Sequence, residues 1–305
     1  MSGNDDVRKI VSDFYTKAVK AGTGCCGPAS SCCGSAPAEG EALVPKGFAA
    51  QFAAYCDDTS GLPADAVENS FGCGNPLAFS EVQPGQVVLD LGSGAGIDLL
   101  IAARKVGPTG RVLGVDMTDE MIARARANVA RAGLANVEVR KGIIEDLPVE
   151  SGSVDWVISN CVINLSPEKD RVFAEIARVL KPGGRMSVSD IVVQDVPDWV
   201  RRSMALYASC VAGAVSEDEY VAGLRRAGLQ DVRVAERYPY DLGQVKAFIA
   251  SEVPTDATAG GCCGTAPAAS PCCCGESASL DMDAIAGEVA SKVWSAKFQA
   301  RKTEA

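Results

Sequence analysis

The side chains best suited to chemistry in this sequence are its thiols. The 305 residues include 13 cysteines and no histidine. Adjacent cysteines occur in two Gly/Pro/Ser/Ala-rich segments, GTGCCGPASSCCGS at 22–35 and GGCCGTAPAASPCCCGE at 260–276. Without imidazole, neither a Ser-His-Asp triad nor a Cys-His pair can form, and acid–base work falls to carboxylates, Tyr, Lys or Cys. The composition favours a reaction that needs little proton transfer and a ligand that binds sulfur.

Three further cysteines stand singly in defined segments: Cys73 in SFGCGNP, Cys161 in SNCVINLSP and Cys210 in LYASCVAGA. Buried cysteine is a common small hydrophobe, so each could simply pack in a core. The three cysteines could also bind zinc, although no CxxC spacing occurs among them. One of them could be a nucleophile, although no histidine is present to activate its thiol. Taken together with the Cys-rich segments, they favour a site for a soft ion.

Charge and hydropathy exclude several classes of protein. The net charge of −10 argues against a nucleic-acid partner, because phosphates require a basic surface. No apolar run approaches the roughly 18 residues of a membrane helix, and the first residues have no apolar stretch of signal-peptide type. We expect a cytoplasmic protein with reduced thiols and no membrane partner, which excludes a disulfide scaffold. The oligomeric state is left open.

Apolar runs alternate with helical periodicity through the middle of the chain. Strands are predicted at 86–91, 111–117, 137–142, 154–160 and 185–191, and helices at 96–107, 119–133 and 168–184. Strict alternation with short turns predicts a doubly wound α/β fold with a mostly parallel sheet. Two last strands, at 231–238 and 246–253, are expected as an antiparallel edge pair that completes seven strands.

The rest of the chain surrounds this core. An amphipathic helix is predicted at 5–20, a helical insertion at 197–228 and a terminal helix at 281–300. The expected organisation is an N-terminal helix and Cys-rich segment (1–80), a Rossmann-like core (81–195), a helical acceptor-site insertion with the final strands (196–255), a Cys-rich linker (256–280) and a C-terminal helix (281–305).

The segment LDLGSGAGID, residues 89–98, follows a predicted strand and opens a helix. Its glycines allow a tight turn and the close approach of a ligand. Asp116 ends the second strand, 26 residues after Asp90, where a carboxylate suits two ribose hydroxyls. Such a loop is also typical of NAD-binding proteins, so NAD is the first rival ligand. Because the carboxyl ends of parallel strands bind ligands, Cys161 after the fourth strand is expected near this loop.

The acid before the glycines and the segment GIIEDLP at 142–148 resemble class I S-adenosylmethionine methyltransferases. By this resemblance, Asp90 and residues 92–96 surround the methionine moiety, Asp116 takes the ribose, and Asn160 lies beside the methionine end. Met117 would pack on the adenine, with Ile144 and Glu145 at its edge. The implied cofactor-binding residues are Asp90, Gly92, Ser93, Gly94, Gly96, Asp116, Met117, Ile144, Glu145 and Asn160.

The segments SFGCGNP, SNCVINLSPEK, RVLKPGGR and CVAGA add a closer resemblance, to arsenite S-adenosylmethionine methyltransferases, over about residues 62–235. It implies that Cys73, Cys161 and Cys210 bind trivalent arsenic. It also implies arsenite or its glutathione conjugate as substrate, and a thiol reductant, glutathione or thioredoxin, as co-substrate. An upstream cysteine often assists in this family. The open choices are Cys25, Cys26, Cys32, Cys33 and Cys56, of which Cys32, Cys33 and Cys56 are taken as auxiliary thiols.

The long Cys-rich segments depart from the family pattern, and their role is left open. Their adjacent cysteines could capture arsenite and pass it inward, which is the favoured interpretation, or could act as electron donors; the segments could also be dispensable low-complexity sequence. Two other functions remain open. A small-molecule C- or O-methyltransferase would use the same cofactor residues and leave the three single cysteines incidental. A thiol-rich protein that sequesters metal or metalloid ions would bind arsenite without producing S-adenosylhomocysteine.

Overall fold

The computed structural model describes residues 3–21, 60–70, 77, 81–196, 210–240, 242–243, 287 and 290–304. Both Cys-rich segments and the predicted strand at 246–253 lie outside these residues. So do Cys73 and the auxiliary candidates Cys32, Cys33 and Cys56.

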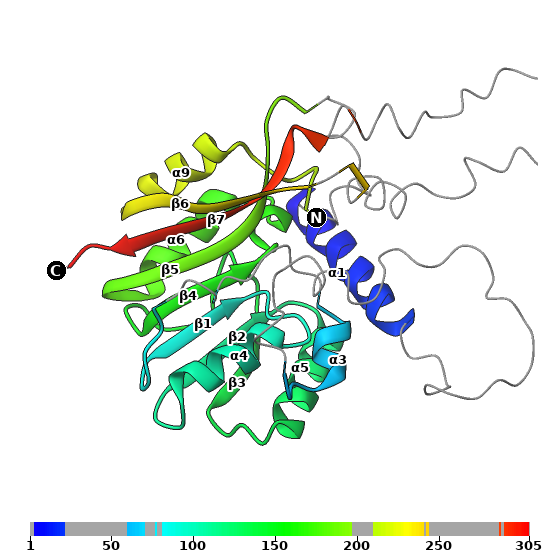
Figure 1. Ribbon diagram of the computed structural model, residues 1–305, viewed down its shortest axis with the longest axis vertical. Coiled ribbons are helices and arrows are strands. Elements are labelled where there is room, and N and C mark those ends of the chain that lie inside the picture. The colour runs from blue at the N-terminus through cyan, green and yellow to red at the C-terminus, as the bar shows by residue number, and fades with distance from the viewer. Residues whose placement is uncertain are drawn as a thin grey trace, which may run out of the picture.

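A seven-stranded sheet forms the centre of the described chain, in the order β3-β2-β1-β4-β5-β7-β6 (Figure 1). The first five strands pair in parallel, and β7 lies antiparallel between β5 and β6. This confirms the predicted Rossmann-like, mostly parallel sheet. The strands are β1 (Val87–Leu91), β2 (Arg111–Asp116), β3 (Val137–Lys141), β4 (Val154–Asn160), β5 (Leu180–Val193), β6 (Leu229–Pro239) and β7 (Val293–Lys302).

Helices cover both faces of the sheet, as buried parallel strands require. On one face, α4 (Ile97–Val106) and α5 (Asp119–Arg131) contribute Leu99 and Ile122 to a core with Val88 and Val112. On the other face, α6 (Lys169–Val179) and α9 (Glu217–Arg226) pack over β4, β5 and β7. The remaining elements are α1 (Gly3–Ala21), α3 (Ala64–Glu68) and the short 3₁₀ helix η1 (Ile163–Leu165).

The boundary between α6 and β5 differs from the prediction. A helix was expected over 168–184, but α6 ends at Val179 and β5 begins at Leu180. Leu180 pairs with Val154, and the register shifts before Trp156 pairs with Arg185. Pro182 and the two glycines after it therefore lie at an irregularity of the strand, a position that tolerates proline and glycine.

The predicted terminal helix at 281–300 is wrong for residues 293–302, which form β7. Alternate residues Ala296, Phe298 and Ala300 face the core beneath α6 and α9, and Phe298 stacks on Tyr220 with ring centroids 4.0 Å apart. The helical spacing of apolar residues in the sequence concealed this period of two. β6 consequently pairs with β7 in the described structure, and the strand expected at 246–253 lies outside the described residues.

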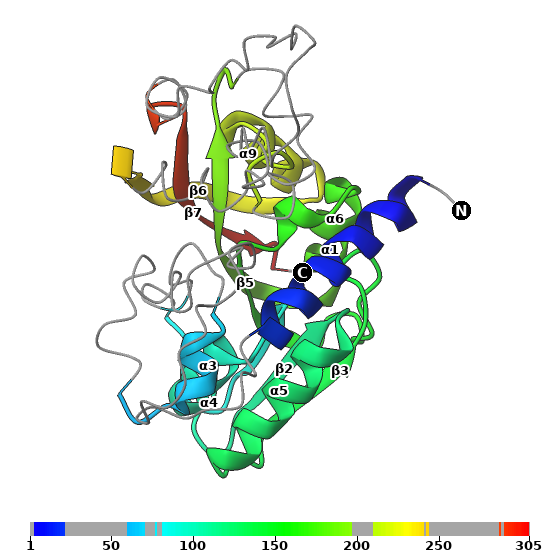
Figure 2. The same ribbon diagram turned by 90° about the vertical axis from the view of Figure 1, so that its right-hand side faces the viewer.

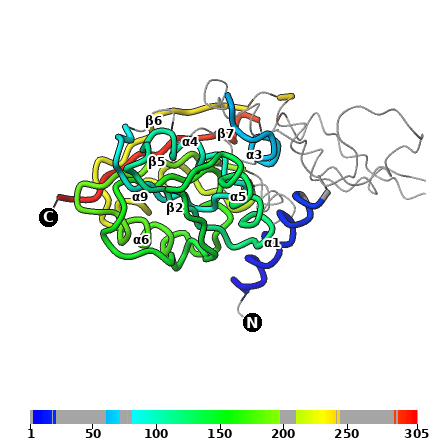
Figure 3. The backbone as a smooth tube through the Cα atoms, turned by 90° about the horizontal axis from the view of Figure 1, so that it is seen from below, coloured from blue at the N-terminus to red at the C-terminus, as the bar shows by residue number. Residues whose placement is uncertain are grey.

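Helix α1 lies across the carboxyl ends of the parallel strands (Figures 1 and 2). Seen from below, α1 lies on the opposite side of the molecule from the C-terminal end of β7 (Figure 3). Its second half is attached to α5: Thr16 Oγ1 donates to Glu120 (3.0 Å), Lys20 pairs with Glu120 (2.8 Å), and Arg124 donates to the carbonyl of Val19 (2.8 Å). α1 is therefore placed over the edge where α/β sheets bind ligands.

The connection between β6 and β7 also starts and ends at this edge. Pro239 pairs with Trp294, and Val293 pairs with Val193 at the end of β5. Tyr240 and Ala290, which flank the connection, pack against a cluster that contains Cys161 and Cys210. The connection that contains the Cys-rich segment at 260–276 therefore leaves and re-enters the described structure near Cys161 and Cys210.

The two parts of the C-terminal region should respond differently to deletion. We expect removal of residues 293–305 to prevent stable folding, because truncating a buried Phe alone costs about 3–5 kcal/mol of a typical total of ~5–15 kcal/mol. Removal of residues 257–280 should leave a cooperative thermal transition, measured by circular dichroism. Cooperative unfolding of the chain that lacks 293–305 would contradict the role of β7.

Candidate active site

The loop between β1 and α4 approaches the neighbouring chain too closely for a side chain. Gly92 has a φ of 66°, and a Cβ there would lie 2.5 Å from the side chain of Val162. The amides of Gly92 and Ser93 donate to the carbonyl of Val115 at 2.8 and 3.1 Å. Gly96, with a φ of 96°, precedes α4. The glycines thus allow the loop to lie against β2 and against the chain that follows β4.

Three buried carboxylates surround this loop: Asp90, Asp98 and Asp116, which are 2%, 5% and 9% exposed. Asp116 accepts hydrogen bonds from the amides of Gly94 (2.9 Å) and Thr118 (2.8 Å). Within the described part of the chain, neither Asp90 nor Asp116 has an ion-pair partner. Burial raises the pKa of Asp90, as do the charges of Asp98 and Asp116, and burial also raises the pKa of Asp116. A cationic ligand would relieve this unfavourable concentration of negative charge.

A pocket opens between the glycine-rich loop, α1 and the chain after β3 and β4. Most residues expected to bind the cofactor line it: Gly92, Ser93, Gly94, Asp116, Met117, Ile144, Glu145 and Asn160. Asp90 and Gly96 are not in its wall, so Asp90 acts on the pocket through its charge. The wall also includes residues that we did not predict, among them Arg8, Val11, Asp98, Thr118 and Ser166. Tyr15, on the predicted N-terminal helix, lines it as well.

The polar groups of this pocket fit a ligand such as S-adenosylmethionine, which carries a sulfonium and an ammonium group. The buried hydroxyl of Ser93 has no hydrogen-bond partner among the described residues. Asn160, at the end of β4, donates through Nδ2 to Asp98 at 3.3 Å. Acceptors and negative charge are therefore present at the loop where the resemblance places the methionine moiety. Asp98 lies within the quoted loop motif, which was the available signal for its role.

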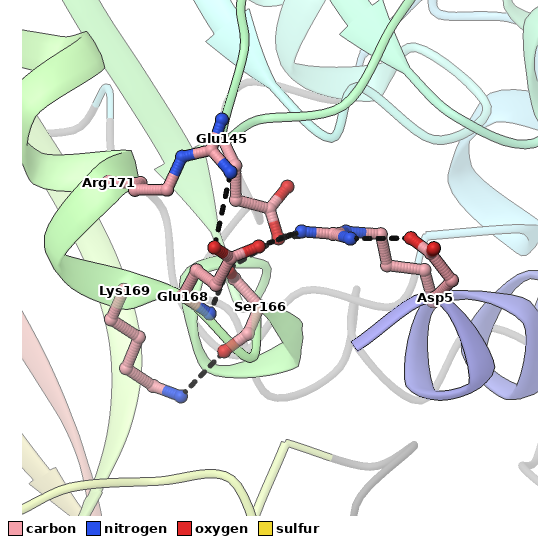
Figure 4. Close-up of polar contacts among 7 residues, drawn as sticks. Asp5, Glu145, Ser166, Glu168, Lys169 and Arg171 are labelled. Atoms are coloured by element: carbon pink, nitrogen blue, oxygen red, sulfur yellow. Dashed lines mark hydrogen bonds and ion pairs between the residues drawn. The ribbon is translucent and has the colours of Figure 1, made fainter. Parts of the chain in front are cut away.

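Glu145, expected at the adenine edge, is held by protein groups. It accepts hydrogen bonds from Ser166 Oγ (2.7 Å) and Arg8 Nε (3.2 Å). Its side chain is 3% exposed and still contributes to the pocket wall. Figure 4 shows Glu145 beside Ser166 and Glu168. The sequence offered no signal for Arg8, because this contact joins residues 137 positions apart.

Two of the three single cysteines come together beside the pocket. Cys161 follows β4, is 4% exposed and lines the pocket, and its amide donates to the carbonyl of Ser189 (2.9 Å). Cys210 is 2% exposed, and its Sγ donates to the carbonyl of Cys161 at 2.8 Å. Both residues have positive φ angles, 57° and 70°, which is uncommon for residues other than glycine. The structure thus brings together residues 49 positions apart in the sequence.

The two sulfurs differ in bonding state. Cys161 is disulfide-bonded, whereas Cys210 is a thiol. No group of three Cys, Asp or Glu side chains suited to a metal ion occurs within the described ranges. The proposed convergence of Cys73 on this place therefore stays a prediction.

A fully buried carboxylate, Asp190, lies behind the thiols. It accepts hydrogen bonds from Asn164 Nδ2 (2.8 Å), the amide of Ile191 (3.1 Å) and Tyr220 Oη (3.3 Å). Burial raises the pKa of Asp190 to about 7, against the lowering effect of Lys169 and these hydrogen bonds. Asn164 also donates to the carbonyl of Ile191 (2.6 Å), so this group joins β5 to the turn that follows Cys161. The sequence signal for a special role of Asp190 was the presence of an acid within the predicted apolar strand RMSVSDI.

A family model described as a methyltransferase domain matches residues 83–228. Together with the sheet order, the glycine-rich loop and the acid that ends β2, this match identifies residues 83–228 as a methyltransferase domain. In the parts of the chain that are described, no helix has the length and apolar character needed to cross a membrane.

More specific similarities extend over most of the chain. An arsenite methyltransferase of Halobacterium salinarum is 44% identical over 241 residues, which are 76% of this chain and 60% of that protein. One from Aquipseudomonas alcaligenes is 40% identical over 61% of this chain and 59% of that protein. The crystal structure of an arsenic(III) S-adenosylmethionine methyltransferase from Chlamydomonas reinhardtii superposes with a TM-score of 0.62 and 31% identity, covering 85% of this chain and 75% of that one.

The chain therefore belongs to the arsenite S-adenosylmethionine methyltransferase family, as its sequence motifs predicted. It spans about 60% of the length of the curated relatives it matches.

Asp190 should make folding stability depend on pH. Between about pH 4 and 7, the native state keeps a proton on Asp190 that the unfolded chain releases, so stability falls as pH rises. The Asp190→Asn variant lacks this proton. The free energy of unfolding is measured in urea for both proteins. The difference, variant minus wild type, should rise by up to about 1.4 kcal/mol per pH unit in this range. Parallel pH–stability curves would show that Asp190 is already ionised in the native state.

Proposed function

We propose that this protein transfers a methyl group from S-adenosylmethionine to trivalent arsenic held by cysteine thiolates, giving methylated arsenicals in arsenic detoxification. The observation that supports this most directly is the contact of Cys210 with Cys161, a residue of the pocket wall: Cys210 Sγ lies 2.8 Å from the Cys161 carbonyl. An acceptor bound by these sulfurs would lie next to the loop where the donor binds.

Cofactor binding follows from the charge of the pocket. Asp90, Asp98 and Asp116 provide buried negative charge close to a ligand that is positively charged at its reacting end. Asn160 orients Asp98, and the backbone of residues 92–94 forms the wall. In our proposal Asp116 binds the ribose, and Met117 and Ile144 pack on the adenine. Glu145 contributes mainly by holding this part of the pocket together, because Arg8 and Ser166 occupy its carboxylate.

The acceptor half needs thiolates and no general base. Trivalent arsenic is soft and prefers sulfur ligands, and three thiolates leave its lone pair directed away from them. S-adenosylmethionine supplies an electrophilic methyl group, which that lone pair takes while the carbon–sulfur electrons leave with S-adenosylhomocysteine. No proton leaves the arsenic, so a chain without histidine can support the reaction. The protein's main contribution is to hold the two reactants in line.

Methylation leaves the arsenic formally pentavalent, and two electrons return it to the trivalent state. In the proposed cycle, two cysteine thiolates supply them by closing a disulfide, and a thiol reductant, glutathione or thioredoxin, reopens it. A sulfur that is held in a disulfide, as that of Cys161 is here, must be reduced before it can bind arsenite. A reducing compartment such as the cytoplasm suits this chemistry. Cys73 as third ligand, with Cys32, Cys33 and Cys56 as auxiliary thiols, completes the proposal.

Replacing either thiol should separate acceptor chemistry from cofactor binding. We expect Cys161→Ser and Cys210→Ser to reduce arsenite-dependent formation of S-adenosylhomocysteine at least about a hundredfold, because misplacing the acceptor by an ångström has an effect of this size. Affinity for S-adenosylhomocysteine, measured by calorimetry on the reduced proteins, should change little. The reaction uses labelled S-adenosylmethionine, glutathione and arsenite, with the arsenic species separated.

The rival functions give different results in the same assay. A C- or O-methyltransferase would retain methyl transfer to its carbon or oxygen acceptor in both cysteine variants. A sequestering protein would take up arsenite in fixed stoichiometry without forming S-adenosylhomocysteine. Wild-type protein that produces no methylated arsenic under reducing conditions would overturn the proposal.

A further inference from the structure

One face of α1 forms the roof of the cofactor pocket. Arg8, Val11 and Tyr15 follow one another at helical spacing, and all three line the pocket. Val11 is 1% exposed and packs in the cluster that contains Cys161 and Cys210. A single helix face thus contacts both the cofactor half and the thiol half of the site.

Arg8 is the charged residue of this face, and it contacts three carboxylates. Its guanidinium donates to Glu145 through Nε (3.2 Å), pairs with Glu168, and donates through Nη1 to Asp5 (3.0 Å). The side chains of Arg8 and Glu145 are 16% and 3% exposed. Burial alone would lower the pKa of Arg8, but the hydrogen bonds and charges of Glu168 and Glu145 raise it. Arg8 therefore neutralises a buried acid that contributes to the pocket.

The two main partners of Arg8 come from different parts of the fold. Glu145 belongs to the segment after β3, which forms the predicted adenine side of the pocket, and Glu168 precedes α6 in the segment that begins with Cys161. Ser166 joins them directly: its hydroxyl donates to Glu145 (2.7 Å) and accepts from the amide of Glu168 (3.0 Å). Figure 4 shows Glu145, Ser166 and Glu168 meeting at this place. One guanidinium thus connects α1, the cofactor side and the thiol-bearing segment.

Other contacts of α1 within the described residues include apolar packing and polar contacts with α5. Among its described side chains, Val11 and Val19 are the buried ones. Its C-terminal half is joined to α5 by the polar contacts of Thr16, Lys20 and Val19. At its N-terminal half, the ion pairs of Arg8 join α1 to Glu145 and Glu168 in other parts of the fold. Breaking them would free the end of the helix that covers the pocket.

We propose that Arg8 is a positioning residue that clamps α1 and the two segments over the bound cofactor, and so limits how fast S-adenosylmethionine and S-adenosylhomocysteine exchange. The inference rests on the cofactor-binding function and is independent of the arsenic acceptor. Arginine suits this role because its planar group can bond two carboxylates at once, whereas the compact ammonium of lysine reaches one of them poorly. Removing it would also leave Glu145 buried without its cation, which favours opening.

The test compares variants on the two sides of the clamp. Arg8→Met removes the guanidinium, and Glu168→Gln weakens the clamp at a residue outside the pocket wall. Arg171→Met is the matched control, because Arg171 donates to the same Glu168 (3.1 Å) from the exposed side of α6. The dissociation rate of S-adenosylhomocysteine is measured by stopped flow. Hydrogen exchange of the amides in residues 3–21 is followed on the ligand-free proteins.

We expect Arg8→Met to raise the dissociation rate about tenfold, the equivalent of losing one hydrogen bond between charged groups. Glu168→Gln should raise it less, Arg8→Lys should give an intermediate rate, and the effects of Arg8→Met and Glu168→Gln should not add in the double variant. The amides of α1 should exchange faster in Arg8→Met than in the wild type. In Arg171→Met their exchange rates should equal those of the wild type.

Two results would overturn the clamp: dissociation rates that are equal in wild type, Arg8→Met and Glu168→Gln, or an equal rise in Arg171→Met. Faster dissociation without faster exchange in α1 would also overturn it, because the effect would then be local to the pocket wall. If wild-type protein fails to bind S-adenosylhomocysteine at all, the cofactor function on which the inference rests is wrong. The thermal midpoints of all variants show whether each one is folded.

Discussion

The end of β4 is the constraint on which the rest of the site depends. Asn160 and Cys161 are consecutive, yet they serve different halves: Asn160 bonds to Asp98 beside the glycine-rich loop, and Cys161 lies under Cys210. The chain turns after β4 with a positive φ at Cys161. This turn brings Val162 so close to the glycine-rich loop that position 92 has no room for a Cβ. In the proposed mechanism a single step along the chain therefore separates the donor site from the acceptor site, and the parallel sheet holds that step in place.

Charge is distributed unevenly over the pocket. On one side of the pocket, Arg8 forms an ion pair with Glu145. The charge of Glu145 is therefore balanced by the protein itself and needs no ligand. Around Asp90 and Asp116 no cation is provided by the described residues, and the pKa values of both acids are raised. Buried charge without a partner is unfavourable, so a cationic ligand gains affinity at that end. In our proposal, the positively charged end of S-adenosylmethionine therefore binds near the acids that have no protein cation.

Much of the fold was predictable because it is encoded locally. The alternation of apolar runs and amphipathic helices gave the parallel core, and the acid and glycines of residues 90–96 gave the cofactor loop. β7 was missed because its stability comes from two neighbouring strands, and its buried Lys297, 2% exposed, interrupts the apolar pattern. Arg8 was missed for a similar reason, since its partners Glu145 and Glu168 lie far away in the sequence. Cys161 was found because its position after a strand is a local signal.

The central proposal is that the sulfurs of Cys161 and Cys210 receive trivalent arsenic at the edge of the cofactor pocket. Anomalous scattering at the arsenic absorption edge, from crystals of reduced protein grown with arsenite and S-adenosylhomocysteine, locates the metalloid directly. The account predicts an arsenic peak at bonding distance from both sulfurs, facing the glycine-rich loop. Arsenic bound elsewhere in the protein, with both sulfurs unoccupied, would contradict it.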